Sequence, residues 1–262
     1  MSFIFSGGCA LNCEWNSGWI KSGLFSDVFI QPCANDSGSA IGTAVDAMLF
    51  YTGNAKIEWT VYSGEEPVHD DLEEKDYFEV SDFNPSDVAQ YLKNDIVLGW
   101  VKGKYEIGPR ALGARSILAS PINKKMLDKL NQIKRREEFR PIAPMCLEED
   151  MGKYFEPSTP SPFMLQFRNV ISDHIPAVTH VDRSARPQSV SLKETPDLYE
   201  TMLEFKKITG VSVLCNTSLN FNGFGFINRL SDMGRFAIKH GLDGFVFENH
   251  IFLKKNNKKE LL

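Results

Sequence analysis

Glycine-bearing turns near the start of the chain are the first residues whose types could do chemistry. Residues 6–12 read SGGCALN, and residues 35–38 read NDSG. Glycine lets a backbone approach a ligand closely, and the free N–H groups at the start of a helix attract anions. The first turn therefore predicts either a nucleotide or anion site near Gly8 and Asn12, or an ordinary structural turn.

Asp36 precedes a segment of helical character, where its carboxylate could bind a metal ion or simply cap the helix. Residues 3–5 and 27–32 are expected to be strands, each followed by one of the two turns, in an order that favours an α/β unit. Open α/β sheets bind ligands at the edge where parallel strands end. The two turns are therefore predicted to lie at the same sheet edge.

Arginines recur in the middle of the chain, in segments shaped by glycine and proline. Residues 106–116 read EIGPRALGARS, which places Arg110 and Arg115 five apart in a tight turn. Arg140 precedes Pro141, which holds it extended beside a hydrophobic stretch, so we expect it to point into a cleft. Guanidinium groups bind phosphate or carboxylate in a bidentate manner. The alternative for the first segment is a surface loop with two solvated arginines.

Uncharged polar residues follow a strand predicted at residues 211–214. Residues 215–220 read CNTSLN, whose amides and hydroxyls suit a nucleotide or a carbamoyl group, the alternative being an Asx or Ser turn. Arg186 is a further candidate anion ligand. The lysines of a helix predicted over residues 124–134 are interpreted as a solvated face and are assigned no chemistry.

Composition is that of a folded globular protein, with 42% hydrophobic and 24% charged residues among 262. No apolar run approaches the roughly 20 residues that span a bilayer, and residues 1–8 lack the features of a signal peptide. We therefore expect a soluble, cytoplasmic protein with no membrane partner. Histidine and cysteine spacings argue against a zinc site, and no P-loop motif occurs.

Charge is distributed unevenly along the chain, whose net charge is −5. Residues 1–101 contain 16 acidic and 4 basic residues, whereas residues 102–140 contain 11 basic and 4 acidic ones. The basic segment predicts a local anion site, or else a solvated helix face. An RNA-binding function fits less well, because the overall charge is negative and no basic stripe with interleaved aromatic residues occurs. We expect small-molecule substrates and no nucleic acid.

The elements that must position these residues fall into three parts. Residues 1–58 carry the strand and helix pattern described above, residues 59–94 are expected to be an acidic linker, and residues 95–262 form a second region. Strands are predicted at residues 96–101, 164–167, 188–190, 211–214 and 244–247. Helices are predicted at residues 10–22, 40–51, 85–93, 124–134, 196–209 and 231–240.

Five motifs, taken in order, resemble those of the O-carbamoyltransferases, the family of nodulation, cephalosporin and aminoglycoside carbamoyltransferases. They are SGGCALN at residues 6–12, NDSG at 35–38, GPRALGARSIL at 108–118, FRP at 139–141 and NTS at 216–218. The resemblance runs from about residue 5 to residue 253 and corresponds to the C-terminal part of such enzymes.

The resemblance implies an α/β fold in two parts. The first is the C-terminal remnant of an actin-like, Hsp70-like carbamoyl-transfer domain over residues 1–58. The second, over residues 95–262, is an open twisted α/β adenylation domain resembling threonylcarbamoyl-adenylate synthase.

In that family the adenylation domain makes carbamoyl adenylate from ATP and carbamoyl phosphate, with Mg²⁺ accompanying ATP. The transfer domain then passes the carbamoyl group to an acceptor hydroxyl. The resemblance implies that Gly8 and Asn12 contact the adenylate in the transfer site, and that Asp36 is a metal ligand. It also implies an adenylation site that is lined by Arg110, Arg140, Arg186, Asn216 and Ser218. The three arginines are its expected catalytic residues.

Two departures from the family bear on function. The family takes metal-binding histidines from its N-terminal half, and this chain has no matching pair. Fe²⁺ or another divalent metal is therefore expected only together with that missing half, which could be a partner chain. After Asn220 the family continues toward Gly-Glu-Pro, whereas residues 223–225 here are Gly-Phe-Gly. These departures favour the alternative of a non-catalytic nucleotide-binding or regulatory fragment, and the complete set of arginines favours the enzyme.

Overall fold

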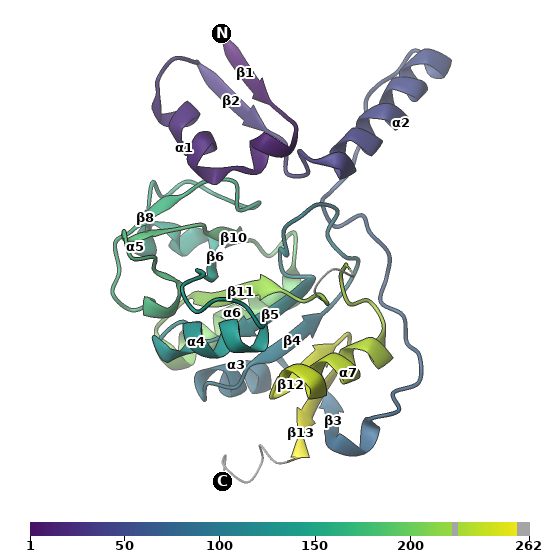
Figure 1. Ribbon diagram of the computed structural model, residues 1–262, viewed down its shortest axis with the longest axis vertical. Helices are drawn as coiled ribbons and strands as arrows, with labels where there is room; N and C mark the ends of the chain where they lie inside the picture. The colour runs from purple at the N-terminus through teal and green to yellow at the C-terminus, as the bar shows by residue number, and fades with distance from the viewer. Residues whose placement is uncertain (222–224, 256–262) are drawn as a thin grey trace.

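The computed structural model describes residues 1–221 and 225–255, arranged as a small N-terminal unit beside a larger unit built on one sheet (Figure 1). Phe224, where the sequence departs from the family, lies outside the described residues. Among the helices of the described ranges, none combines the length and apolar character needed to cross a membrane.

The N-terminal unit has a two-stranded parallel sheet flanked by helices. Its elements are β1 (Ser2–Phe5), the 3₁₀ turn η1 (Gly8–Leu11), α1 (Cys13–Lys21), β2 (Asp27–Ile30) and α2 (Asp36–Thr52). The backbone N–H of Gly7 donates to the carbonyl of Ala34 at 2.9 Å, so the two turns lie at the same sheet edge, as predicted. Gly38 is required there, because a Cβ at this position would lie 2.0 Å from the carbonyl oxygen of Cys33.

Eight strands form the mixed sheet of the larger unit, in the order β10-β6-β11-β5-β4-β12-β13-β3. Only the β10–β6 and β12–β4 pairs are parallel among these strands. The strands are β3 (Phe78–Asp82), β4 (Leu98–Val101), β5 (Arg115–Ala119), β6 (Ala143–Leu147), β10 (Gln188–Val190), β11 (Val213–Ser218), β12 (Gly244–Phe247) and β13 (His250–Lys254).

Helices cover both faces of this sheet. In Figure 1, α4 (Lys125–Ile133) and α7 (Leu230–His240) lie in front, whereas α3 (Pro85–Lys93) and α6 (Pro196–Thr209) pack together behind. Shorter elements complete the fold: η2 (Lys75–Tyr77), η3 (Glu148–Asp150), α5 (Met151–Tyr154), η4 (Pro176–Val178) and a small sheet of β7 (Phe155–Glu156), β8 (Arg168–Val170) and β9 (Ser184–Ala185).

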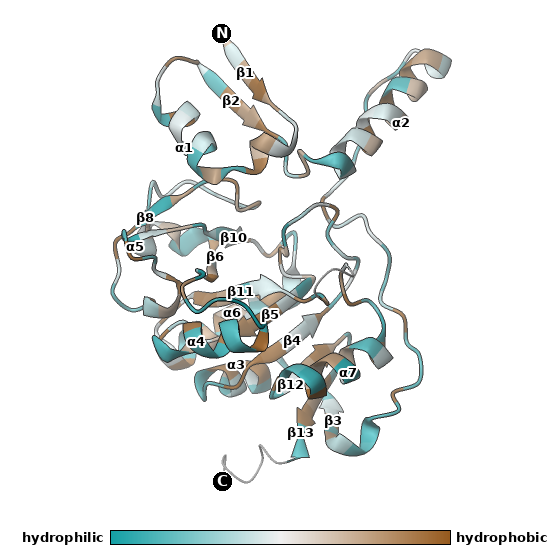
Figure 2. Ribbon diagram, in the orientation of Figure 1, coloured by the Kyte–Doolittle hydropathy of each residue, from teal (hydrophilic) through white to brown (hydrophobic). Residues whose placement is uncertain are grey.

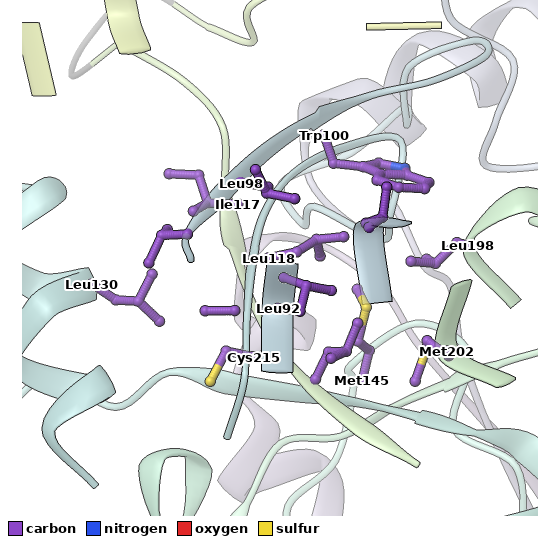
Figure 3. Close-up of a cluster of buried hydrophobic side chains, with 14 of the residues drawn as sticks. Leu92, Leu98, Trp100, Ile117, Leu118, Leu130, Met145, Leu198, Met202 and Cys215 are labelled. Atoms are coloured by element: carbon purple, nitrogen blue, oxygen red, sulfur yellow. The ribbon is translucent and has the colours of Figure 1, made fainter. Parts of the chain in front are cut away.

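The core lies between the sheet and these helices. Gly99 in β4 faces α7 so closely that a Cβ would lie 2.5 Å from Cε of Met233. Side chains alternate along a strand, so Leu98 and Trp100 point to the opposite face, where both are buried. Figure 3 shows the side chains that meet in this core, among them Leu92 from α3, Leu198 and Met202 from α6, and Leu118 from β5.

Most predicted helices and strands are present, and one predicted strand is wrong. The helices over residues 85–93 and 196–209 have the predicted bounds. Residues 164–167 are irregular, and β8 begins only at Arg168. The reason is tertiary, since Asn16 donates to the carbonyl of Leu165 in place of a neighbouring strand.

The acidic segment at residues 59–94 is only partly a connection. Residues 78–82 form β3, which pairs with β13 at the end of the large sheet, and α3 packs against α6. Acidic Glu79 and Asp82 therefore belong to an edge strand, where charged side chains discourage pairing with another chain. Residues 78–93 are part of the larger unit rather than a linker.

Candidate active site

A cavity of about 320 Å³ lies at one end of the large sheet, where several connections meet. Strand β11 runs antiparallel to β5 and β6, and β10 runs parallel to β6. The end of β11 therefore lies beside the starts of the other three strands. The residues that line the cavity come from these ends and the loops next to them: Pro109, Arg110, Ala111, Arg136, Arg140, Pro141, Ile142, Ala143, Met164, Phe167, His180, Arg186, Asn216, Thr217 and Ser218.

Four arginines line the cavity, and no aspartate or glutamate of the described ranges does. Burial lowers the pKa of Arg110, and the neighbouring Arg186 lowers it further. Burial also lowers the pKa of Arg136, with additional effects of Arg140 and Arg186. Glu137 opposes this effect on Arg136 and pairs with Arg140 at 3.7 Å. Like charges gathered in one cavity disfavour the folded state, and such clusters are typical of functional sites. This cavity has the electrostatics of a polyanion site.

A buried carboxylate shapes the loop that carries Arg110. Glu106 is 1% exposed, and its Oε1 accepts hydrogen bonds from the backbone N–H groups of Leu112 at 2.6 Å and Ala114 at 2.7 Å. Backbone N–H groups in an irregular loop need such acceptors once they are buried. Glu106 therefore fixes the path of the loop and, through it, the place of Arg110.

Lys134 adds a fifth cation next to the cavity. Its Nζ donates to the carbonyl of Ser218 and to Oδ1 of Asn220, both at 2.7 Å. Ser218 in turn donates its hydroxyl hydrogen to the same Asn220 oxygen at 2.8 Å. Burial, with a contribution from Arg136, lowers the pKa of Lys134 to about 8. The charge of Lys134 therefore changes with pH near neutrality.

The N-terminal unit contacts the walls of the cavity. Nη2 of Arg110 donates to the carbonyl of Leu11 at 2.9 Å, and Asn16 donates to the carbonyl of Leu165 at 2.9 Å. Residues 164–167 include two that line the cavity. The position of the small unit and the shape of the cavity are therefore linked.

Two known protein families match the sequence of this chain. Residues 89–254 match the family described as the carbamoyltransferase C-terminus, and residues 2–45 match the carbamoyltransferase N-terminus. The chain belongs to the carbamoyltransferase family.

Several curated members of this family are similar to the chain. The 3'-hydroxymethylcephem-O-carbamoyltransferase of Streptomyces clavuligerus is 50% identical over 88% of this chain and 45% of that protein. The enzyme of the same name from Amycolatopsis lactamdurans is 48% identical over 92% of this chain and 46% of that protein. Nodulation protein U of Rhizobium fredii is 43% identical over 86% of this chain and 39% of that protein. The chain thus spans about half the length of these cephem relatives, and less of the nodulation protein.

One solved structure, full-length HypF in the phosphate- and nucleotide-bound form, shares a weak likeness with the chain. Its TM-score is 0.46 at 16% identity, over 65% of this chain and 22% of that one. A likeness at this level supports no conclusion about function.

The structure brings all five residues of the predicted adenylation site to this one cavity: Arg110, Arg140, Arg186, Asn216 and Ser218. Arg140 is the most exposed of the four cavity arginines, with 53% of its side chain exposed. Its Nη1 lies 3.7 Å from Oε2 of Glu137. Its predicted cleft exists, but Arg140 lines the cavity without being enclosed by it.

The three residues predicted for the transfer site lie elsewhere. Gly8 and Asn12 are exposed, and Oδ1 of Asn12 caps α1 by accepting from the backbone N–H of Glu14 at 3.0 Å. Asp36 is exposed at the first residue of α2. Across the described ranges, no three histidine, cysteine or acidic side chains lie close enough to hold a metal ion. These residues alone do not form a metal site.

Sequence reasoning missed Lys134, which is 6% exposed and not part of a solvated face. The signal was present in the helical spacing, since Met126, Leu130 and Lys134 are four residues apart and share a face. His180 was also missed, and a lone histidine offers no comparable signal. Arg115 is completely buried and donates to Asn228 rather than lining the cavity.

Proposed function

We propose that this chain forms carbamoyl adenylate from ATP and carbamoyl phosphate, as the adenylation part of an O-carbamoyltransferase. The observation that carries the proposal is the set of four arginines in one cavity without a carboxylate. Both substrates are phosphate compounds, and arginine matches phosphate with two parallel charge-assisted hydrogen bonds. The family assignment supplies the carbamoyl chemistry.

The proposed reaction has two anionic leaving groups, phosphate and pyrophosphate, which explains the need for several cations. Water releases phosphate from carbamoyl phosphate, and an oxygen of the resulting carbamate attacks the α-phosphorus of ATP, which expels pyrophosphate. Negative charge grows on the leaving oxygens in both steps. Fixed guanidinium groups that are partly shielded from solvent stabilise such charge more strongly than water does. Mg²⁺ would enter bound to the phosphates of ATP.

Transfer to an acceptor hydroxyl is proposed to require a further part of the enzyme, corresponding to the part of the cephem relatives that this chain does not cover. In this proposal residues 1–58 belong to an actin-like, Hsp70-like transfer domain, and residues 95–262 to a domain like threonylcarbamoyl-adenylate synthase. Two observations support it. The chain spans about half of its cephem relatives. Hydrophobic residues, brown in Figure 2, occur along β1, β2 and α2, and Ile4, Phe29 and Phe50 among them are exposed. Fe²⁺ or another divalent metal would join Asp36 only in that assembly.

Calorimetric titration with ATP and with carbamoyl phosphate, singly and together in the presence of Mg²⁺, tests the proposal. Pyrophosphate is followed in the same sample. Binding of both ligands with pyrophosphate release is expected. Binding of ATP without pyrophosphate would instead support the alternative, a non-catalytic nucleotide-binding or regulatory fragment.

Arg140→Ala tests the arginine cluster directly. The side chain is half exposed and its one ion pair, with Glu137, lies at the surface, so its removal should change the free energy of unfolding by less than about 0.5 kcal/mol. Affinity for ATP or carbamoyl phosphate should fall about tenfold, because one charge-assisted hydrogen bond contributes about 1.5–3 kcal/mol. Equal affinities in the two proteins would contradict the assignment of Arg140.

A further inference from the structure

The amide of Asn216 is a buried polar group in the wall of the cavity. The residue lies in β11, between β5 and β6, and is 2% exposed. An asparagine in the interior of a central strand requires hydrogen-bond partners for both ends of its amide. Only one end has them here.

Hydrogen bonds to backbone carbonyls show that the nitrogen end of the Asn216 amide is the one with partners. Nδ2 of Asn216 donates to the carbonyl of Ala111 at 2.9 Å and to Oε1 of Gln188 at 3.2 Å. Gln188 is itself fixed, because its Nε2 donates to the carbonyl of Leu112 at 2.6 Å. A backbone carbonyl can only accept, so rotating either amide would place two oxygens in contact. The nitrogen of Asn216 is therefore committed to the protein.

Oδ1 of Asn216 is left as a buried acceptor to which no side chain or backbone group of the described ranges donates. A buried polar atom without a partner costs about 1–3 kcal/mol. The side chains that line the same cavity are rich in donors, since four of them are arginines. Oδ1 is thus an unpaired acceptor on a residue that lines a cavity rich in donors.

We propose that Asn216 is a specificity-determining residue that accepts a hydrogen bond from the NH₂ of the carbamoyl group. The inference rests on the proposed function and assigns the recognition of the carbamoyl nitrogen to one atom. The arginines bind the phosphate portion, which carbamoyl phosphate shares with acetyl phosphate and inorganic phosphate. Only the carbamoyl compound has an N–H donor for Oδ1, whereas acetyl phosphate places a methyl group there. A site built to hydrogen-bond an N–H rejects an analogue that lacks it, because its own buried group stays unpaired.

The test compares the three phosphate compounds by calorimetry on the whole chain. The wild-type protein should bind carbamoyl phosphate at least about tenfold more tightly than acetyl phosphate, a ratio that corresponds to about 1.4 kcal/mol. Asn216→Leu should reduce this ratio to about 1 through weaker binding of carbamoyl phosphate alone. Equal wild-type affinities for the two compounds would overturn the inference, whether or not the variant folds.

Cys215→Ala is the matched control, because Cys215 is the preceding residue of the same strand, is equally buried and is not among the residues that line the cavity. It should keep the wild-type ratio, and a ratio lost equally in both variants would show that strand packing rather than Oδ1 sets it. Pyrophosphate release separates the two proposals. If carbamoyl phosphate binds selectively but no pyrophosphate is released, the role of Asn216 stands and the adenylation reaction is contradicted. If pyrophosphate is released but binding is not selective, the adenylation reaction stands and the role of Asn216 is contradicted.

Discussion

At the scale of single residues, a buried arginine and a half-buried one show how a structural group differs from a proposed binding group. Arg168 is 3% exposed and donates to the carbonyls of Pro157 and Pro160 and to the hydroxyl of Thr159. Arg186 lines the cavity, and its guanidinium makes no hydrogen bond among the described residues, whereas Arg168 leaves only its Nε without a partner. Its charge also lowers the pKa of Arg110. A side chain that costs folding free energy in this way is typical of a functional site.

Arg186→Gln should therefore separate stability from binding. Removing a cation that repels Arg110 and Arg136 should leave the free energy of unfolding unchanged or slightly higher, while affinity for ATP falls about tenfold or more. Urea unfolding and calorimetric titration measure the two effects. Arg235→Gln is the control, because Arg235 is exposed on α7 and forms a surface ion pair with Asp232 at 2.7 Å, so both quantities should stay as in wild type.

Lys134 predicts a pH dependence of ligand binding. Its pKa of about 8 means that the ammonium group loses its proton between pH 7 and pH 9, while the arginines stay charged. A bound polyanion favours the protonated form, so affinity for ATP should fall as the pH rises, by up to about tenfold between pH 7 and pH 9. Titrations at pH 7, 8 and 9 should show this slope in wild type and a flatter one in Lys134→Met. The same slope in both proteins would show that another group titrates.

At the scale of elements, the loop between β4 and β5 depends on side chains rather than on a ladder of backbone hydrogen bonds. Gly113 adopts φ +101°, and a Cβ there would lie 2.4 Å from Cδ2 of Leu198 on α6. The carbonyls of residues 111 and 112 accept from Asn216 and Gln188. The loop is therefore anchored to β10, β11 and α6 at once, which places Arg110 in the cavity.

Glu106 holds the other side of this loop, and Glu106→Ala tests its role. The change leaves the N–H groups of Leu112 and Ala114 buried without their acceptor, so the free energy of unfolding should fall by about 3 kcal/mol or more. Affinity for carbamoyl phosphate should fall as well, measured at a temperature where the variant is folded. Glu106→Gln keeps one carbonyl oxygen and should lose less of both. Unchanged affinity in a folded Glu106→Ala protein would show that the loop keeps its path without Glu106.

At the scale of the whole molecule, the two units differ in how much apolar surface they bury. The core of the large sheet is almost fully enclosed, whereas no residue of α2 is buried. Phe50 and Tyr51 on α2 are each 82% exposed, and Phe29 on β2 is 56% exposed. The rings of Phe50 and Tyr51 contact each other, with their centroids 5.1 Å apart. Exposed apolar clusters are typical of an interaction site.

The exposed surface predicts self-association of the isolated chain. Sedimentation velocity should show concentration-dependent association, which the double change Phe50→Ser and Tyr51→Ser should reduce while the melting temperature stays within about 2 °C of wild type. Leu192→Ser is the control, since Leu192 is 55% exposed on the larger unit. Association that is insensitive to the α2 changes would place the contact elsewhere.

Local patterns in the sequence determined the helices, most of the strands and the main motifs. The helix over residues 196–209 could be predicted because Pro196 and Gly210 mark its ends and its apolar residues repeat at helical spacing. The parallel pairing of β1 and β2 followed from the strand–helix–strand order. The five residues of the proposed adenylation site were recognised as candidates one motif at a time.

Only the tertiary structure decided how these motifs meet and which cations are enclosed. Residues 164–167 have the composition of a strand, but hydrogen bonds to α1 hold them as a cavity wall. Lys134 and Arg115 are buried because of elements far away in sequence, and the free end of the Asn216 amide follows from contacts with residues 111 and 188. Periodicity reports contacts within an element. Charge clustering and amide orientation depend on groups that only folding brings within a few ångströms of each other.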